Sequence, residues 1–375
     1  MAKIEVIEVE SASQLKQFIT YPNRLYRNDP NYVTPLISER LEFFDQEKNP
    51  FFHSARVKMF LAMDGNEVVG RIATCINYNH NDFQAEQVGF FGFFDCPDDY
   101  EIASTLLKVA MITIKREGME KMRGPMSFST NHECGFLIEG FDSPPTVMMT
   151  YNQPYLPRLT EKFGLKKAMD LVAYRFSEEV PVSPRIAKVV EKITARAKIT
   201  IRSLNMKDFD NEVKRIHRVY NQAWEKNWGF IPMTKDEFFH TAKNLKQILD
   251  PDIAFVCERG DTPVAFCLAL PDINQALIHL KGKLWPTGLL KLLWHTKIRN
   301  KINCARIITF GVIPQFQKRG LEMIMYHACF TTATGKGYSW GEASWVLETN
   351  DLMRKAIEQM GATVYKRYRI VEMPL

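Results

Sequence analysis

The chain has 375 residues, of which 46% are hydrophobic and 25% are charged, and its formal net charge is +6. This composition is that of a soluble globular protein and excludes a disordered or fibrous chain. The length is sufficient for two domains, so we first expect two copies of one fold in tandem. The modest positive charge gives little support to a nucleic-acid partner, and it suits an anionic cofactor or an acidic membrane surface equally well.

The sequence also predicts a cytoplasmic location. Neither a signal peptide nor a lipidation motif occurs between Met1 and Glu10, and no apolar run is long enough to span a bilayer. The seven cysteines form no Cys-x-x-Cys pair and show no ligand spacing with histidine, so we expect reduced, buried thiols and no metal site. They are Cys75, Cys96, Cys134, Cys257, Cys267, Cys304 and Cys329.

The N-terminal half alternates between strands and helices. Two alternating or apolar runs, 57–63 and 68–76, are joined by Asp64-Gly-Asn66, which is a strong hairpin signal. A later strand leads through the acidic turn Asp95-Cys-Pro-Asp-Asp99 into a helix with one apolar face. In chain order, the predicted elements are a strand at 4–9, helices through Leu15 and Leu36, strands at 57–63, 68–76 and 87–94, a helix from Ile102 to Thr113 and a strand at 122–129.

The C-terminal half follows the same order. It begins near Ile199, after the junction Pro181-Val-Ser-Pro184 and a basic amphipathic helix, and its hairpin turns at Arg259-Gly-Asp261. An insertion over 271–303 precedes the next strand. In chain order, the predicted elements are helices at 213–224 and 235–249, strands at 254–258 and 263–270, a strand from Arg306, a helix from Leu321, a strand through 343–346, a helix through 353–360 and a closing strand up to Tyr368.

The most informative segment runs from Arg306 to Glu322. An apolar strand breaks there into a basic, glycine-containing turn, Gln317-Lys318-Arg319-Gly320, which then opens a helix. The first backbone N–H groups of a helix have no intrahelical partners, and together with the helix dipole they attract a phosphate. The alternative interpretation is an ordinary strand-to-helix turn whose lysine and arginine are solvated.

This turn resembles the acyl-CoA-binding motif of the GCN5-related N-acetyltransferase superfamily, Gln/Arg-x-x-Gly-x-Gly/Ala. The matching residues are Gln317-Lys-Arg-Gly320-Leu-Glu322. The resemblance implies that the pyrophosphate of acetyl-CoA or a longer acyl-CoA lies on Gln317 to Leu321. It also implies that a backbone N–H near Val312 polarises the thioester carbonyl. Glu322 departs from the pattern, because it places a carboxylate where the family has a small residue. This difference puts the affinity of the turn for phosphate in doubt.

The residues that follow the turn resemble the second half of the same fold. In that reading Asn350 sits where the family often contacts the pantetheine arm of CoA. Tyr365 falls near the place where many members keep a tyrosine that protonates the departing thiolate. The alternatives are that Asn350 caps a helix and that Tyr365 belongs to a half-buried core.

The fold class that we expect is therefore α/β (α+β), with two tandem acyl-CoA N-acyltransferase-like units. Each unit is expected to be a mixed, mostly antiparallel sheet flanked by helices. The first unit covers 1–180, a connecting helix 181–198, and the second unit 199–375 with the insertion 271–303. In the first unit the turn is acidic, Asp95 to Asp99, and would repel a pyrophosphate, so we expect CoA to bind the second unit.

A polar segment in the first half is our candidate for the acceptor side. It follows a strand and contains His132 and Glu133 beside glycine-permitted bends. An acceptor amine is protonated at neutral pH and must lose a proton before it attacks a thioester, so a carboxylate or an imidazole is chemically useful there. The acceptor is expected to enter between the two units. A loop whose polar side chains satisfy local backbone groups is the alternative.

The insertion contains a segment, 283–300, with the composition of an interfacial helix. Leucine and tryptophan alternate there with lysine and arginine. It could cover a long acyl chain or make a peripheral contact with an anionic membrane. The alternative is an amphipathic helix docked on its own protein or on a second copy in a homodimer.

Two blocks carry a closer resemblance, Tyr26 to Leu36 and Gly89-Phe-Phe-Gly-Phe-Phe94 with Arg123-Gly-Pro-Met. They resemble a bacterial tandem-domain group of this superfamily whose relatives include bacterial ceramide synthases, which join a long acyl group from CoA to a sphingoid amine. We therefore expect an acyl-CoA-dependent N-acyltransferase with a small-molecule or lipid-like amine acceptor. Two alternatives stay open: an aminoacyl-tRNA-dependent transferase of the peptidoglycan-bridge type, and a non-catalytic protein that binds CoA or another ligand.

Overall fold

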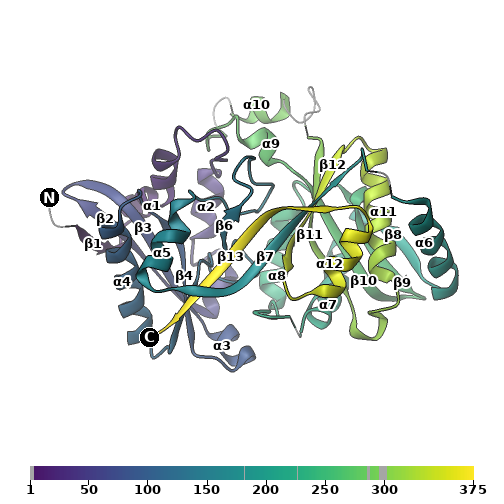
Figure 1. Ribbon diagram of the computed structural model, residues 1–375, viewed down its shortest axis with the longest axis horizontal. Coiled ribbons are helices and arrows are strands. Elements are labelled where there is room, and N and C mark those ends of the chain that lie inside the picture. Colours follow the sequence, from purple (N-terminus) through teal and green to yellow (C-terminus); the bar gives the residue numbers. More distant parts are fainter. Residues whose placement is uncertain (1–3, 181, 226, 285–287, 295–301) are drawn as a thin grey trace. The chain divides into compact units, whose positions relative to one another are not determined.

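The computed structural model describes residues 4–180, 182–225, 227–284, 288–294 and 302–375. The chain divides into two compact units, each with chain from more than one stretch of the sequence (Figure 1). Unit 1 consists of Met1–Asp170, Leu277–Lys291 and Arg367–Leu375, and unit 2 of Leu171–Ala276 and Leu292–Lys366. The closing strand of the chain therefore ends in unit 1.

The sheet of unit 1 has the strand order β1-β2-β3-β4-β5-β13, and β6 also pairs with β13. All of these pairs are antiparallel except β4 with β5. The strands are β1 (Glu5–Glu8), β2 (Ala55–Asp64), β3 (Glu67–Asn77), β4 (Val88–Asp95), β5 (Lys121–Gly124), β6 (Phe136–Glu139) and the part of β13 (Thr363–Pro374) from Arg367 onward. The helices are α1 (Ala12–Leu25), α2 (Ile37–Phe43), α3 (Tyr78–Gln84), α4 (Tyr100–Arg116) and α5 (Tyr155–Phe163), with a 3₁₀ helix at Pro50–His53.

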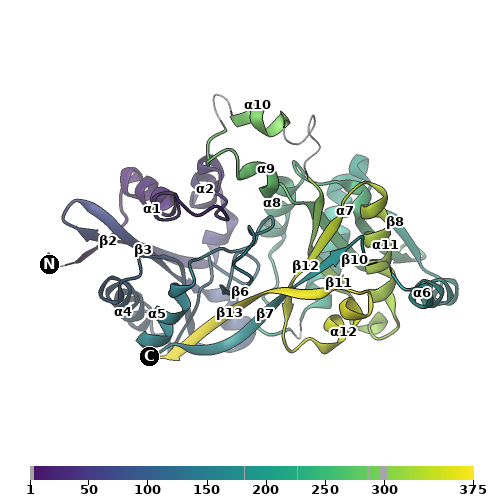
Figure 2. The ribbon, with the colours of Figure 1, turned by 45° about the horizontal axis from the view of Figure 1, so that its top comes forward.

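Local sequence signals explain several of these elements. The β2–β3 hairpin turns at Gly65, whose φ of 57° is the left-handed conformation that glycine adopts without strain. Ser11 begins α1 with a capping box, and the side chain of Asp99 accepts hydrogen bonds from two N–H groups at the start of α4. Figure 2 shows α1 and α2 on one side of β2 and β3, with α4 on the other. The sheet of unit 1 is thus covered on both faces.

The sheet of unit 2 has the strand order β7-β12-β11-β10-β9-β8, in which only β11 and β12 are parallel. The strands are β7 (Lys166–Ser177), β8 (Thr200–Ser203), β9 (Ala254–Arg259), β10 (Thr262–Pro271), β11 (Cys304–Val312) and β12 (Trp340–Leu347). The helices are α6 (Pro184–Ala197), α7 (Phe209–Ala223), α8 (Lys235–Leu245), α11 (Leu321–Gly335) and α12 (Asp351–Gln359), with 3₁₀ helices at Met206–Asp208, Pro251–Ile253 and Pro314–Phe316. Two short helices, α9 (Asn274–Leu277) and α10 (Gly288–Leu293), belong to the insertion.

Two apolar clusters hold unit 2 together. One lies between the sheet and α11, where Leu321 and Met325 are fully buried against residues of β7, β9, β10, β11 and β12. The other lies on α7, where Val219 and Tyr220 pack with Val256 and Phe266 of β9 and β10. Because apolar burial is the main favourable term in folding, these two clusters fix the strands that carry the candidate site.

The fold class predicted from the sequence is confirmed, because each unit is a mixed, mostly antiparallel sheet flanked by helices. The seven cysteines are all buried and none is in a disulfide. Among the helices that the structure describes, none has the length and hydropathy needed to cross a bilayer. Of the predicted interfacial segment, Trp285, Lys297 and Arg299 lie outside the described residues, and the described part exposes Leu290 and Trp294.

Candidate active site

Two parallel strands of unit 2 diverge toward their C-terminal ends. β11 pairs with β12 only from Cys304, opposite Trp340, to Ile307, opposite Ala343. Beyond this point β11 continues against β10 as far as Val312, while β12 continues against β7. We call the divergence of β11 and β12 after Ile307 and Ala343 the fork. A fork of this kind leaves backbone groups of both strands without a β-ladder partner on the other strand.

The edge of β11 that faces the fork can be identified from three hydrogen bonds. The Ile313 N–H donates to the Val264 carbonyl of β10 at 3.0 Å. The Phe310 carbonyl instead accepts from Nε1 of Trp224 at 2.8 Å, and the Val312 carbonyl from Nε2 of Gln317 at 2.9 Å. Because successive residues of a strand present their N–H and C=O groups to opposite edges, the N–H groups of Phe310 and Val312 point away from β10, toward the fork.

The basic turn connects the end of β11 to α11. Lys318 and Gly320 have φ values of 60° and 82°, and Gly320 is the N-cap residue of α11. A β-carbon on Gly320 would lie 2.6 Å from Cδ1 of Ile193 on α6, so the turn needs glycine for both its conformation and its space. The side chains of Lys318 and Arg319 are exposed. The turn thus offers backbone N–H groups at a helix N-terminus together with two exposed cations.

Two residues of the turn have structural roles as well. Leu321 is fully buried and anchors the first turn of α11 in the core. Gln317 bends back so that its amide donates to the Val312 carbonyl, and this holds the turn against the end of β11. The guanidinium of Arg319 lies 5.4 Å from the centre of the Phe316 ring.

Glu322 makes this turn unlike an ordinary anion site, because it places a carboxylate at the start of α11. It is only 7% exposed, and its carboxylate lies close enough to the backbone N–H groups of Lys318 and of Glu322 itself for them to favour its charged form. Burial raises the pKa of this carboxyl group, and the backbone N–H groups oppose that shift. The carboxylate of Glu322 therefore lies beside the N–H groups that the turn would offer to a phosphate.

A buried charged cluster lies at the closed end of the fork. Arg306 on β11 and Glu342 on β12 are direct neighbours in the parallel register and are 2% and 0% exposed. Nε of Arg306 lies 3.5 Å from Oε1 of Glu342 and donates to Oγ of Ser344 at 2.9 Å, and that hydroxyl in turn donates to Oε1 of Glu342. The hydroxyl of Tyr365 donates to Oε2 of the same carboxylate. We refer to Arg306, Glu342, Ser344 and Tyr365 as the Glu342 cluster.

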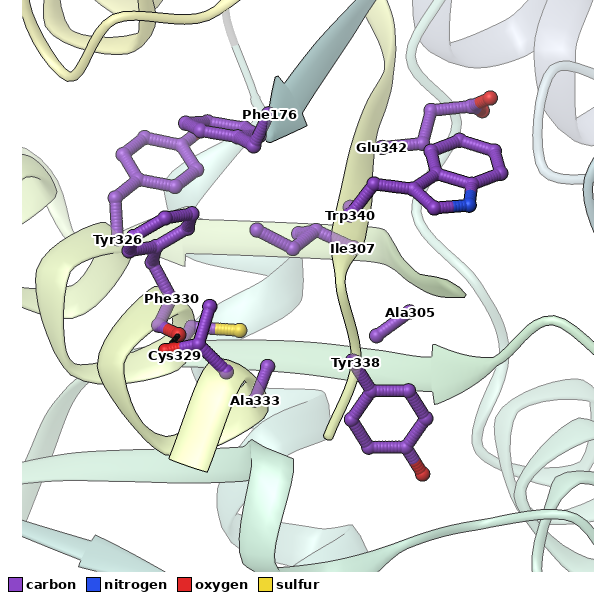
Figure 3. Close-up of a pocket in the computed structure, with 12 residues that line it drawn as sticks. Phe176, Ala305, Ile307, Tyr326, Cys329, Phe330, Ala333, Tyr338, Trp340 and Glu342 are labelled. Carbon is purple, nitrogen blue, oxygen red and sulfur yellow. Dashed lines mark hydrogen bonds between the residues drawn. The ribbon is translucent and has the colours of Figure 1, made fainter. Parts of the chain in front are cut away.

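The Glu342 cluster faces away from α11. Figure 3 shows Trp340 and Glu342 on one side of β12, and Phe176, Tyr326 and Cys329 on the other. The cavity on the α11 side has a volume of about 30 Å³, which is room for a water molecule or two and not for a substrate.

The sequence predicts a role for Tyr365 but not for its partner Glu342 or for Arg306, which pairs with Glu342. Each of these two residues is the single charged residue of an otherwise apolar strand. Because a charged side chain is rarely buried without a partner, this pattern could have indicated a buried ion pair. Asn350 is the N-cap of α12 and accepts from the Met353 N–H at 3.2 Å, which is the capping geometry.

The equivalent strands of unit 1 do not open in the same way. β4 and β5 pair in parallel from Val88 to Phe90, but the Met126 N–H then donates to the Phe91 carbonyl at 2.7 Å. A β-carbon on Gly92 would lie 2.1 Å from the Met126 carbonyl oxygen. The chain that follows β5 therefore stays in backbone contact with β4 at Phe91 and Gly92.

The acidic turn of unit 1 is engaged in internal contacts. Asp95 is buried and accepts from the Tyr26 hydroxyl at 2.6 Å and from Nε of Arg71 at 2.7 Å. Asp98 pairs with Arg158 at 2.9 Å. These carboxylates make the turn a structural element of unit 1 and leave it with the wrong charge for a phosphate.

Glu133 and His132, the predicted acceptor-side residues, lie in unit 1, whereas the predicted cofactor residues and Tyr365 lie in unit 2. The carboxylate of Glu133 accepts a hydrogen bond from Arg40. His132 contacts Oγ of Ser129 through Nδ1 at 2.9 Å, and burial lowers its pKa to about 4, so its imidazole is neutral at neutral pH. In the part of the chain that the structure describes, no histidine, cysteine, aspartate and glutamate side chains gather to hold a metal ion.

No family model matches the chain. The bacterial ceramide synthase of Caulobacter vibrioides is 37% identical over 379 residues, with 100% of this chain and 98% of that protein covered. The protein YghO of Escherichia coli K12 is 35% identical over 365 residues and covers 96% of this chain and 93% of its own length.

The similar solved structures include proteins described as GCN5-related N-acetyltransferases (GNAT proteins). A tandem GNAT protein from the clavulanic acid biosynthesis pathway superposes with a TM-score of 0.57 at 9% identity, and covers 99% of this chain and 98% of its own. A GCN5-related N-acetyltransferase from Sphaerobacter thermophilus gives a TM-score of 0.54 at 13% identity, with 100% and 97% covered. At these identities the likeness concerns the fold, and it extends over both units.

Proposed function

Because the chain belongs to the family of the bacterial ceramide synthase and YghO and shares the fold of GCN5-related N-acetyltransferases, we propose that it transfers an acyl group from acyl-CoA to the amine of a lipid-like acceptor. The fold itself is that of an acyltransferase. The observation that carries the finer proposal is the continuous arrangement of fork, basic turn and helix N-terminus between β11 and α11. It combines an anion site with a row of inward-facing backbone N–H groups.

The arrangement suggests how the donor binds. The pyrophosphate of CoA lies on the N–H groups at the start of α11, with Lys318 and Arg319 supplying charge. The pantetheine arm follows the free edge of β11 into the fork. The thioester carbonyl then accepts from the N–H of Phe310 or Val312, which also stabilises the oxyanion that forms when an amine attacks.

Unit 1 contributes no second donor site in this proposal. Its strands stay closed at Gly92 and Met126, and its turn is acidic. One molecule of CoA per chain is therefore the stoichiometry that we propose. Glu133 and His132 stay candidates for the acceptor side, and the contact of Glu133 with Arg40 must then break or be bridged by water for this carboxylate to take a proton.

Two observations support a lipid-like acceptor. The relative that shares 37% of its residues carries the name ceramide synthase, and a ceramide is an N-acylated long-chain amino alcohol. In the described part of the insertion, Leu290 and Trp294 are 68% and 47% exposed, as expected of a surface that meets long alkyl chains. The proposed acceptor is accordingly a long-chain primary amine.

Calorimetric titration with acetyl-CoA, palmitoyl-CoA and free CoA tests the proposal. We expect one site per chain, tighter binding of palmitoyl-CoA, and a loss of about 100-fold in affinity in the double variant Lys318→Glu/Arg319→Glu, since two charge-assisted contacts become repulsive. The double variant Lys207→Glu/Lys214→Glu makes the same charge change on exposed residues of unit 2 and should bind normally. If wild-type protein binds none of the three compounds, the proposal is wrong. That result would favour an aminoacyl-tRNA-dependent transferase or a non-catalytic ligand-binding protein.

Glu322 provides a second test of the same site. Replacing Glu322 by alanine removes a carboxylate from the N–H groups of Lys318 and residue 322. We expect the dissociation constant for CoA to fall about tenfold, because the pyrophosphate no longer competes with an internal anion. Glu178→Ala, at an exposed glutamate of unit 2, is the control and should leave the constant unchanged. Unaltered binding in Glu322→Ala would show that the pyrophosphate lies elsewhere.

A further inference from the structure

Two side chains cover part of the β11 edge that faces the fork. Nε1 of Trp224 donates to the Phe310 carbonyl at 2.8 Å, and Nε2 of Gln317 donates to the Val312 carbonyl at 2.9 Å. Phe310 and Val312 are the same two residues whose N–H groups point toward the fork. Side-chain N–H donors therefore lie where a neighbouring strand would place its backbone N–H groups.

The packing of α7 on β11 brings Trp224 to this edge. Trp224 is the C-cap residue of α7. The residue before it, Ala223, lies against Gly311, where an added β-carbon would be 3.0 Å from the β-carbon of Ala223. The Ala223 carbonyl also accepts from Nε2 of Gln317 at 3.5 Å. The indole of Trp224 packs on the ring of Tyr220, with 4.9 Å between ring centres. The contact of the indole with β11 is thus built into the fold of unit 2.

The pantetheine arm of CoA carries donors of the same kind as these side chains. It contains two secondary amides on an extended chain, and each amide has one N–H group and one carbonyl. An extended chain pairs with a strand edge through both kinds of group. Because the two side chains occupy the space beside the carbonyls of Phe310 and Val312, the arm can pair fully with β11 only where they move aside.

We propose that Trp224 and Gln317 hold the pairing positions of the pantetheine arm, so that acyl-CoA binds by exchanging its amide N–H groups for theirs. This inference rests on the proposed function and deepens it, since it names side chains that move when the donor binds. The carbonyls of β11 keep a hydrogen-bond donor throughout, so neither is left unpaired inside the protein. The exchange lowers the affinity for the donor, because a ligand must displace an internal contact.

Trp224 is the better of the two residues to test. Gln317 also belongs to the basic turn, so a change there would disturb the proposed pyrophosphate site as well. Trp224 is half-buried, and its ring contacts Tyr220 and Phe230 at 4.9 Å and 6.3 Å between centres. The emission of an indole depends on its hydrogen bond and on its surroundings, so Trp224 should report its own displacement.

The experiment follows tryptophan fluorescence while acetyl-CoA or 3′-phospho-ADP, the nucleotide half of CoA without the arm, is added. We expect acetyl-CoA to change the emission of the wild type, and this change should disappear in Trp224→Phe. The control is Trp340→Phe, which should keep the change, because the Trp340 indole donates to Oδ1 of Asn303 and not to β11. In all three proteins 3′-phospho-ADP should bind without changing the emission.

Calorimetry on the same proteins measures the cost of the exchange. Trp224→Phe keeps an aromatic ring but removes the N–H group that holds the Phe310 carbonyl. We expect acetyl-CoA to bind this variant about fivefold more tightly than the wild type, the effect of one hydrogen bond that no longer has to be displaced. The affinity for 3′-phospho-ADP should be unchanged, since this compound has no arm.

The outcomes separate this inference from the proposed function. If wild-type protein binds neither compound, the proposed function fails. If it binds acetyl-CoA but Trp224→Phe keeps both the affinity and the emission change, the exchange is wrong and the proposed function stands. Weaker binding of acetyl-CoA to folded Trp224→Phe would also overturn the exchange, because the indole would then contact the bound donor. Should this variant fail to fold, an equal response of wild-type emission to both compounds would overturn it.

Discussion

Replacing Arg306 with methionine is expected to lower the free energy of unfolding of unit 2 by about 3–5 kcal/mol, the usual result of breaking one side of a buried ion pair. Arg306 and Glu342 are 2% and 0% exposed. Without the guanidinium, the carboxylate of Glu342 loses the positive charge that offsets its removal from water. The hydroxyls of Ser344 and Tyr365 still donate to it, but they carry no compensating charge.

Urea denaturation followed by tryptophan fluorescence and circular dichroism measures this effect. The double variant Arg306→Met/Glu342→Gln should recover part of the loss, because it leaves no charge unpaired. Arg158→Met is the matched control. It breaks the 2.9 Å pair with Asp98, in which the arginine side chain is 69% exposed, and it should cost less than about 1 kcal/mol. Equal losses in Arg306→Met and Arg158→Met would mean that Glu342 is hydrated or carries its own proton in the folded protein.

Gly92→Ala should destabilise unit 1 by about 3 kcal/mol, as overpacking of a well-packed interior does. A β-carbon at residue 92 would lie 2.1 Å from the Met126 carbonyl oxygen and 3.0 Å from the Ser127 nitrogen. Both contacts are with backbone, so a side-chain rotation cannot relieve them and the chain after β5 must move. This is the contact that holds the segment after β5 against β4.

Gly335→Ala is the control for this variant. A β-carbon there meets nothing within 4 Å, and Gly335 is the last residue of α11, where alanine is the better helix former. Its effect should be near zero or stabilising. Thermal unfolding gives the stabilities, and calorimetry with palmitoyl-CoA should show that folded Gly92→Ala keeps wild-type affinity, because the proposed donor site lies in unit 2. A neutral Gly92→Ala would indicate that β4 and the segment after β5 separate easily.

Local sequence signals were enough for the fold class and for the turn. The hairpin at Asp64-Gly-Asn66 follows from the left-handed conformation that glycine allows, and Gly65 adopts it. The helix that opens after Gly320 follows from an apolar face that repeats at helical spacing, and Leu321 and Met325 of that face are fully buried. Both are short-range properties, set by the conformation of a few consecutive residues.

The contacts of the site depended on tertiary structure. The partners of Glu342, namely Arg306 and Tyr365, stand 36 and 23 residues away in the chain, and a charge in an apolar strand has no periodic signal that names its partner. For the same reason, sequence patterns could predict a strand near Tyr365 but not that its continuation from Arg367 onward joins the sheet of unit 1. Periodicity and turn chemistry record how a segment folds on itself. The pairing of strands and the burial of charges depend on which distant segments meet, so only the folded chain shows which carboxylate Tyr365 contacts.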